Sequence, residues 1–170
     1  MTTIIGVQYD NGFIMAADSQ VTVHQRPFSH SSVRKITEVG QYVIAGSGNA
    51  RYCDVIQYGW EPPVFTDGDK YTFMVKEFIP AMKEMHDNCG YSLKDGEVFY
   101  FLVGLENELF YICEDYSIVR TEHGVYASGT GGELAMGALF AGASVDQAME
   151  IAKTLDINSG GDTIIVKRGM

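Results

Sequence analysis

The stretch TTIIGVQYDNGFIMAAD, residues 2–18, decides how the rest of the chain is interpreted. Its first half is rich in β-branched residues, which predicts a strand over residues 3–9. Asp10-Asn11-Gly12 predicts a tight turn, because Asn and Gly tolerate positive φ. The apolar residues after the turn return as a second strand. Such a hairpin brings the start of one strand beside the end of the other, so Thr2 and Asp18 are expected to lie close together.

Thr2 is a candidate nucleophile because a small second residue allows an aminopeptidase to remove Met1. Removal would leave an α-amino group beside the Thr2 hydroxyl, and the ordinary pKa of such an amine is about 8. The neutral amine could then take the hydroxyl proton, so that one residue supplies both nucleophile and base. Threonine is also an ordinary second residue, and this start alone is a weak motif.

Composition and charge limit the classes of partner. The 170 residues fit a single domain spanning 1–170, and an apolar content of 46% can fill its core. The net charge of −10 argues against nucleic acids and anionic membranes, which call for basic patches. The longest uncharged apolar run, residues 134–145, is too short to cross a bilayer.

Cysteine usage predicts a cytoplasmic protein. The three cysteines form no CxxC pair, which is typical of reduced thiols, and no signal peptide is visible. His86 and Cys89 have suggestive spacing for a metal, but no second pair completes four ligands. We therefore expect no metal and no cofactor.

The remainder of the first half predicts strands followed by helices. A polar loop with His24, Arg26, Pro27 and His30 should precede a hairpin that turns near Gly40 and ends at the break Gly46-Ser47-Gly48. Asn49 is a candidate cap for a helix over residues 50–58. A longer helix over 71–88 has apolar residues at three- and four-residue steps, and Pro80 should kink it.

The second half repeats this plan. The patterns predict strands over 97–105, 109–114, 117–120 and 125–128, helices over 133–141 and 144–155, and a final strand over 163–167. Strands and helices in separate blocks favour an α+β fold, in which helices pack outside antiparallel sheets.

Several polar residues have both an ordinary and a functional interpretation. Asp18 by itself is typical of a solvated strand end, and Lys35 of a solvated lysine, but an inward-facing Lys35 would need an acidic partner such as Asp18. The glycines of 129–132 could bind phosphate at a helix start, although no Gly-Lys-Ser/Thr follows, so a closely packed helix start is favoured. No nucleophile-elbow pattern indicates a Ser-His-Asp enzyme.

Four segments together, in order and at near-family spacing, resemble the β-type proteasome subunits and the bacterial HslV peptidase, which are N-terminal nucleophile hydrolases. The segments are TTIIGV at 2–7, AADSQVT at 16–22, RKI at 34–36 with AGSG at 45–48, and GTGG at 129–132 with DINSGG at 156–161. The resemblance implies a four-layer αββα sandwich of two antiparallel sheets.

The resemblance also implies roles for catalytic residues. Thr2 would be the nucleophile and its amine the base, with Lys35 beside the hydroxyl and Asp18 holding Lys35. The backbone N–H of Gly48 would serve the oxyanion hole. Asp156 and Ser159 would support the Thr2 amine, and Thr130 stands where the family usually has serine.

Substrate-binding residues are implied in the same way. Thr22, Gly48 and Ala50 would pair with the substrate backbone as an added strand. Val21, Val33, Gly46 and Ala50 would lie near the pocket for the residue before the cut, which favours large hydrophobic side chains and disfavours acidic ones.

The resemblance therefore implies a threonine-type endopeptidase that cleaves unfolded polypeptides inside a homo-oligomeric double ring. Six- or seven-fold symmetry and a separate ATP-dependent unfoldase are expected. Two alternatives stay open: a non-catalytic proteasome-like ring protein, and a small-molecule amide hydrolase of the same fold. Apolar residues of the helices over 71–88 and 133–141 would either contact other subunits or be buried against their own sheets.

Overall fold

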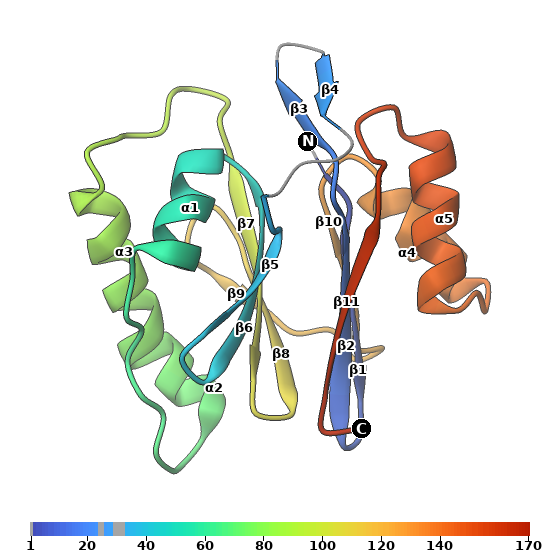
Figure 1. Ribbon diagram of the computed structural model, residues 1–170. Coiled ribbons are helices and arrows are strands. Elements are labelled where there is room, and N and C mark those ends of the chain that lie inside the picture. The colour runs from blue at the N-terminus through green and yellow to red at the C-terminus, as the bar shows by residue number, and fades with distance from the viewer. Residues whose placement is uncertain (1, 24–25, 29–32) are drawn as a thin grey trace.

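Two antiparallel sheets pack face to face, and helices cover the outer face of each (Figure 1). This is the predicted four-layer αββα sandwich. The computed structural model describes residues 2–23, 26–28 and 33–170. Among these residues, no helix has the length and apolar character needed to span a membrane.

The first sheet has the strand order β10-β1-β2-β11. Its strands are β1 Ile4–Tyr9, β2 Gly12–Asp18, β10 Val125–Ser128 and β11 Thr163–Arg168. β1 and β2 form the predicted hairpin, in which Ile4 is opposite Ala17. β11 pairs with the other side of β2, so β2 is a central strand, and all seven of its residues are buried.

The second sheet has the order β5-β6-β7-β8-β9. Its strands are β5 Ile36–Val39, β6 Tyr42–Gly48, β7 Phe99–Leu105, β8 Glu108–Ile112 and β9 Ile118–Val119. The expected break at Gly46-Ser47-Gly48 is wrong, because all three residues pair with β7. Glycine weakens a strand only slightly, and pairing with β7 keeps this segment extended.

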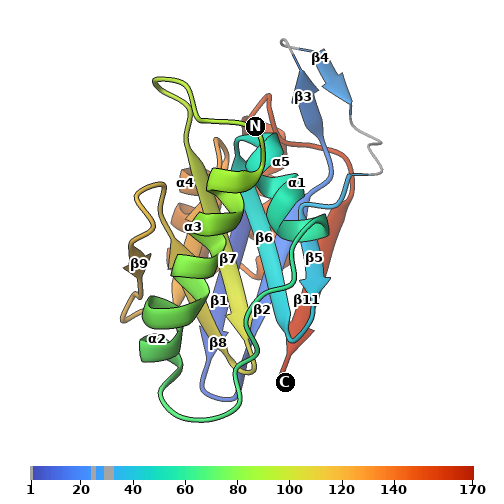
Figure 2. The same cartoon turned by 90° about the vertical axis from the view of Figure 1, so that its left-hand side faces the viewer.

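The outer layers are two groups of helices. Over the second sheet lie α1 Ala50–Tyr58, α2 Lys70–Phe73, the π-helical η1 Met74–Phe78 and α3 Ile79–Asn88 (Figure 2). Over the first sheet lie α4 Gly132–Phe140 and α5 Val145–Leu155. Asn49 caps α1, as predicted, and Ser144 forms a capping box with Gln147 at the start of α5.

A π-helical turn lies just before Pro80, where the sequence predicted a kink. Proline has no N–H and its ring clashes with the carbonyl four residues earlier. The wider turn of η1 directly precedes Pro80 and accommodates the proline inside one continuous run of helix.

Three apolar clusters hold the layers together. One lies between the two sheets and includes Phe13, Met15 and Leu102. The others lie between each sheet and its helices and include Phe78 and Met149. With cores on both faces, both sheets are held at fixed positions, and so are the ends of their strands.

A short hairpin corrects the prediction of a polar loop after residue 22, since Arg26 and Pro27 belong to a strand. It consists of β3 Val21–Val23 and β4 Arg26–Phe28, and it projects beyond the sheets (Figure 1). Strands of three residues are too short to show a periodic pattern. His24 and His30 lie outside the described residues.

Candidate active site

The Asp18 carboxylate is the centre of a polar cluster at one end of the sandwich. Asp18 is the last residue of β2 and is fully buried. Its Oδ1 accepts hydrogen bonds from Thr2 Oγ1 at 2.9 Å, the Thr3 N–H at 2.8 Å and Lys35 Nζ at 2.7 Å. Its Oδ2 accepts from the backbone N–H groups of Gln20 at 3.2 Å and Gly160 at 3.0 Å. Five donors thus compensate the burial of this charge.

Lys35 brings its charge to Asp18 from the other sheet. It lies immediately before β5, is 8% exposed, and its Nζ forms an ion pair with Asp18 Oδ1. The Lys35 carbonyl accepts from Gln57 Nε2 at 2.9 Å and from the Gly46 N–H at 3.1 Å. These bonds fix the backbone from which the ammonium projects. The cluster therefore joins the two sheets at their common end.

Burial and the carboxylate act in opposite directions on Lys35. Burial lowers the pKa of the ammonium, since it penalises the charged form, and the charge and hydrogen bond of Asp18 offset part of this effect. The net pKa of Lys35 is below its ordinary value of 10.5. The ammonium is thus less strongly protonated than a solvated lysine would be.

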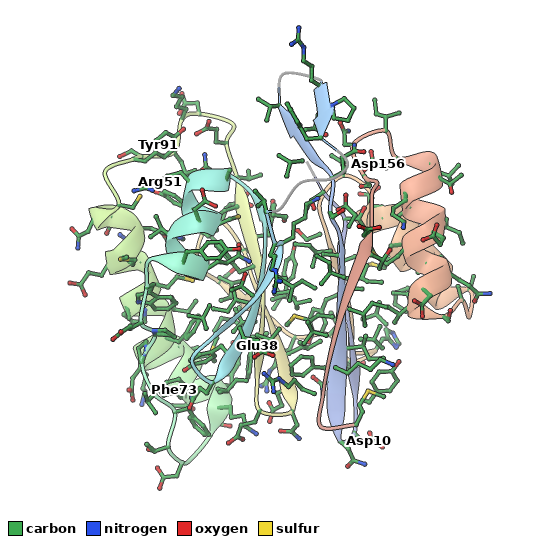
Figure 3. The ribbon with its side chains drawn as sticks, viewed as in Figure 1. Asp10, Glu38, Arg51, Phe73, Tyr91 and Asp156 are labelled. Atoms are coloured by element: carbon green, nitrogen blue, oxygen red, sulfur yellow. The ribbon has the colours of Figure 1, made fainter. Side chains whose placement is uncertain are left out.

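A second polar chain runs from Thr3 to Thr130. Thr3 Oγ1 and Ser159 Oγ are 2.7 Å apart, and Ser159 Oγ donates to Asp156 Oδ2 at 2.6 Å. Thr130 Oγ1 donates to the same Asp156 oxygen at 2.6 Å. A Cβ on Gly131 would lie 2.1 Å from Thr3 Oγ1, so this chain requires glycine there. Figure 3 shows Asp156 at the end of the sandwich opposite to Asp10.

Opposing effects also determine the pKa of Asp156. Partial burial raises it, but hydrogen bonds from Ser159, Thr130 and Asn158 together outweigh burial and lower the pKa below 3.8. These bonds favour the ionised carboxylate.

A stability measurement can test this network. The pKa of Asp156 in the folded protein lies below that of an unfolded aspartate, which is about 3.9. The ionised carboxylate therefore contributes its full stabilisation above about pH 3.9, and this contribution is lost as the pH falls through the folded pKa. Asp156→Asn should therefore lower the free energy of unfolding at pH 7, and the deficit should shrink below about pH 4. Urea titrations from pH 7 to pH 3 measure this. The exposed Asp95→Asn is the control, and an equal deficit at all pH values would contradict the assignment.

A pocket of about 170 Å³ opens beside this cluster. Its lining includes Thr2, Lys35 and the predicted pocket residues Val21, Val33, Gly46, Gly48 and Ala50. It also includes Arg34, Ser47, Cys53, Asp54 and Gln57, which the sequence did not place there. Thr2 is 4% exposed and is one of the residues that line this pocket.

Gly48 is at the pocket edge of β6 in a conformation that favours glycine. Its φ is +92°, and a Cβ would lie 2.1 Å from the Val98 carbonyl oxygen. The next N–H, that of Asn49, donates to the Val98 carbonyl at 2.8 Å. The Gly46 N–H instead donates to the Lys35 carbonyl, on the side of β6 that faces β5. Strand alternation therefore directs the Gly48 N–H away from β7 and toward the pocket.

The structure does not bring every predicted site residue to the pocket. Thr22 lies in β3, where its Oγ1 accepts from Gln20 Nε2 at 3.5 Å, and Thr22 does not line the pocket. Thr130, Asp156 and Ser159 form their own network and contact the Thr2 region through Thr3. Lys35 and Thr2 share Asp18 Oδ1 as an acceptor.

Sequence reasoning missed the residues that act through their backbone. The N–H groups of Thr3, Gln20 and Gly160 bind Asp18. Backbone donors carry no side-chain signature, so only the fold could reveal them. Only the side chain of Thr3, which contacts Ser159, left a signal in the sequence, because it is a polar residue directly before the apolar run of β1.

The described residues contain no cluster of three or more His, Cys, Asp or Glu side chains that could hold a metal. His86 is buried and stacks on Tyr52 with ring centroids 3.9 Å apart, and its Nδ1 lies 3.0 Å from Tyr116 Oη. Burial lowers the pKa of His86 to about 4. These contacts give His86 a packing role within the helical layer.

Comparison with known proteins adds two findings. The family model described as "Proteasome subunit" matches residues 1–56. No curated protein matches the sequence. The matched segment contains Thr2, Asp18 and Lys35 together with the β6 end of the pocket.

Solved structures share the fold over nearly the whole chain. Thiobacillus denitrificans BPH in complex with epoxomicin has a TM-score of 0.77 at 20% identity, covering 99% of this chain and 98% of that chain. A second structure of Thiobacillus denitrificans BPH has a TM-score of 0.77 at 18% identity, with coverage of 99% and 98%. Eukaryotic HslV from Trypanosoma brucei has a TM-score of 0.68 at 20% identity, with coverage of 99% and 100%.

Identity at this level establishes a shared fold, and the sequence match adds a relationship over the segment that carries Asp18 and Lys35. Together they support the predicted resemblance: residues 1–56 are similar to proteasome subunits, and the whole chain has an αββα sandwich similar in fold to HslV.

Proposed function

We propose that the protein is a threonine-type endopeptidase in which Thr2, freed of Met1, attacks the peptide bond. The family match supports a proteasome-like peptidase as the general class. The observation that carries the finer proposal is the convergence of Thr2 Oγ1 and Lys35 Nζ on one oxygen of buried Asp18.

The chemistry follows from these positions. In the mature protein the Thr2 α-amine accepts the hydroxyl proton, and the oxygen adds to the substrate carbonyl. The Lys35 ammonium, held within reach by Asp18, stabilises negative charge on the Thr2 oxygen. The Gly48 N–H, directed toward the pocket, stabilises the oxyanion. The protonated α-amine then gives its proton to the leaving amine as the peptide C–N bond breaks, which leaves an acyl-enzyme ester. Water hydrolyses this ester with the same amine, now neutral, as base.

Lys35 needs Asp18 for this role. A buried cation without a partner would lose its proton or turn toward solvent. Burial already lowers the pKa of Lys35, and the adjacent carboxylate opposes that shift. Asp18 therefore keeps Lys35 protonated and in place, while the four other donors keep Asp18 from rotating.

The N-terminal amine depends on the second polar chain. Thr3 is fully buried, and its side chain contacts Ser159, which donates to Asp156. This chain fixes the residue that follows Thr2 and thereby the direction in which the amine projects. Thr130 adds a hydrogen bond that holds the Asp156 carboxylate in its orientation.

An assay of peptide cleavage tests the proposal. Purified protein whose intact mass shows that Met1 has been removed should hydrolyse fluorogenic peptides, because both nucleophile and base are then present. Failure of such protein, in its assembled form, to cleave any member of a broad panel would contradict it.

We further propose that the protein works in the cytoplasm as a homo-oligomeric double ring that encloses its active sites and receives unfolded chains from an ATP-dependent unfoldase. Of the apolar residues considered for subunit contacts, Phe73, Met74, Phe78 and Met82 are buried against their own sheet. The exposed apolar side chains left for such contacts include Phe140 and Leu155 on the outer layer of α4 and α5. Closed symmetry is the usual solution for such surfaces.

The assembly has its own test. Native mass spectrometry at micromolar concentration should give a mass of twelve or fourteen chains, as six- or seven-fold double rings require. Negative-stain microscopy of the same sample should show stacked rings. A stable monomer or dimer that still cleaves its substrate would contradict the chamber and favour a small-molecule amide hydrolase.

A further inference from the structure

Two serine hydroxyls meet between the sheets, at the end of the sandwich where Thr2 lies. Ser47 Oγ and Ser128 Oγ are 2.5 Å apart, so that one hydroxyl donates a hydrogen bond to the other. Ser47 is 3% exposed and Ser128 is 8% exposed. The proposed reaction uses neither hydroxyl. This hydrogen bond joins β6 of one sheet to β10 of the other, shielded from water.

The strand pattern brings both serines to the space between the sheets. Along β6, Val43 and Ala45 belong to the apolar cluster between the sheets, and alternation directs Ser47 to the same face. Along β10, Tyr126 belongs to that cluster, and Ser128 follows two residues later. Each inward face thus ends in a hydroxyl. Because a buried hydroxyl without a partner is costly, each serine needs the other.

Ser47 governs the position of the Gly48 N–H, since this N–H belongs to the peptide bond that joins the two residues. β5 begins at Ile36, which is opposite Ala45, whereas β7 pairs with β6 as far as Gly48. The last two residues of β6 therefore extend past β5, and their strand pairing within the described chain is with β7 alone. The Ser47 side chain supplies a second anchor for this peptide.

Ser128 connects the anchor to the nucleophile. It is opposite Ile4 of β1, two residues after Thr2. The following residue, Gly129, has a φ of +84°, and a Cβ there would lie 2.0 Å from the Thr2 carbonyl oxygen. The end of β10 is therefore packed directly against the backbone of Thr2.

We propose that the hydrogen bond between Ser47 and Ser128 fixes the distance between the Thr2 hydroxyl and the Gly48 N–H. Thr2 precedes the first strand of one sheet and Gly48 ends a strand of the other, so this distance depends on how the two sheets are held at their common end. Both serines are then positioning residues for the oxyanion hole. This inference rests on the proposed peptidase function and deepens it.

The topology places this link opposite the one that the ion pair forms. In the first sheet, β1 lies between β10 and β2. Ser128 is at the end of β10, and Asp18, the partner of Lys35, is at the end of β2. The start of β1, where Thr2 lies, is therefore flanked by two bonds that cross to the second sheet. Loss of either bond should allow the sheets to shift at the site.

The position of an oxyanion donor has a large effect on rate. Such a donor acts when it is about 2.7–3.1 Å from the oxygen that becomes charged, and its removal costs about a hundred- to a thousandfold in kcat. A misplacement of about 1 Å can cost about a hundredfold. The charge develops only in the transition state, so the loss should appear in kcat and not in KM.

Kinetics of a Ser128 series test the inference. Ser128→Ala should lower kcat by about ten- to a hundredfold and leave KM unchanged. Ser128→Cys should show a similar loss, since its thiol fills the space but bonds weakly. Ser128→Thr keeps the hydroxyl and should restore most of the rate. Thr37→Val is the control, because within the described residues the buried Thr37 Oγ1 has no hydrogen-bond partner. Circular dichroism checks that each variant is folded.

Peptide aldehydes provide a second measurement. The Thr2 oxygen bonds to the aldehyde carbon, the hydroxyl proton passes to the α-amine, and the former carbonyl oxygen becomes an oxyanion that the Gly48 N–H can stabilise. The matching peptide alcohol binds without this addition. Ser128→Ala should therefore weaken inhibition by the aldehyde about tenfold or more and leave inhibition by the alcohol unchanged. A general loss of packing would weaken both inhibitors.

The double variant Ser47→Ala/Ser128→Ala shows whether the serines act as a pair. If they act through each other, the second substitution should add little to the first, both in kcat and in the urea midpoint of unfolding. Additive losses, or wild-type kcat and aldehyde inhibition in folded Ser128→Ala, would overturn the inference and leave the peptidase proposal intact. A wild type that cleaves no peptide and binds the aldehyde no more tightly than the alcohol would contradict the peptidase proposal, and the positioning role with it.

Discussion

Thr2→Ala should abolish peptide hydrolysis, with a loss of more than about a thousandfold in kcat/KM, because the substitution removes the nucleophile and retains only substrate binding and the oxyanion hole. The fold should survive. Asp18 loses one of five hydrogen bonds, which costs about 1 kcal/mol. Fluorogenic peptide assays and urea titrations measure the two effects separately.

Thr2→Ser is the matched control for this substitution. Serine keeps the α-amine and the hydroxyl and removes only the methyl group. It should therefore retain measurable turnover that Thr2→Ala lacks. Turnover near the wild-type level in pure Thr2→Ala protein would show that another residue is the nucleophile, whatever the fold.

Lys35→Ala should lower kcat/KM by about a thousandfold or more, since the Thr2 oxygen loses the cation that stabilises its negative charge. It should also destabilise the protein by about 3–5 kcal/mol, because buried Asp18 is left without a counter-ion. The activity must therefore be measured where circular dichroism shows the variant to be folded.

Asp18→Asn should reduce activity through a different cause. Asp18 accepts five hydrogen bonds on two oxygens, but asparagine has one carbonyl oxygen and an NH₂ group. The amide nitrogen would face N–H donors, so either Lys35 and Thr2 or Gln20 and Gly160 lose their acceptor. The double variant Lys35→Ala/Asp18→Asn removes both charges and should be more stable than Lys35→Ala alone. If the folded single variants matched the wild type in kcat/KM, the proposed roles of Lys35 and Asp18 would be wrong.

The sequence predicted which strands bring the site residues together better than it predicted the direction of their side chains. The β1–β2 hairpin followed from the β-branched residues and the Asp10-Asn11-Gly12 turn, and it correctly placed Thr2 beside Asp18. The orientation of Lys35 could not be read from the pattern, because its neighbours alternate imperfectly. Its partner is 17 residues away in the chain and belongs to the other sheet, so only tertiary packing fixes its direction.

The remaining differences have local physical causes. β6 continues through Gly46 and Gly48 because pairing with β7 overrides the weak strand propensity of glycine. Asp54 was missed as a pocket residue because its position on α1 matters only once the helix is docked across the end of β6. Backbone donors such as the Gly160 N–H have no sequence signal at all.

The central claim is that Thr2 acts through a free α-amine, and one measurement tests it most directly. The protein is prepared with a removable N-terminal extension that ends immediately before Thr2, and peptide hydrolysis is measured before and after the extension is cut. Intact mass spectrometry confirms the cut, and native mass spectrometry confirms that assembly is unchanged. The account predicts no turnover with the extension in place and full turnover once Thr2 is the first residue. Equal turnover before and after removal would contradict it.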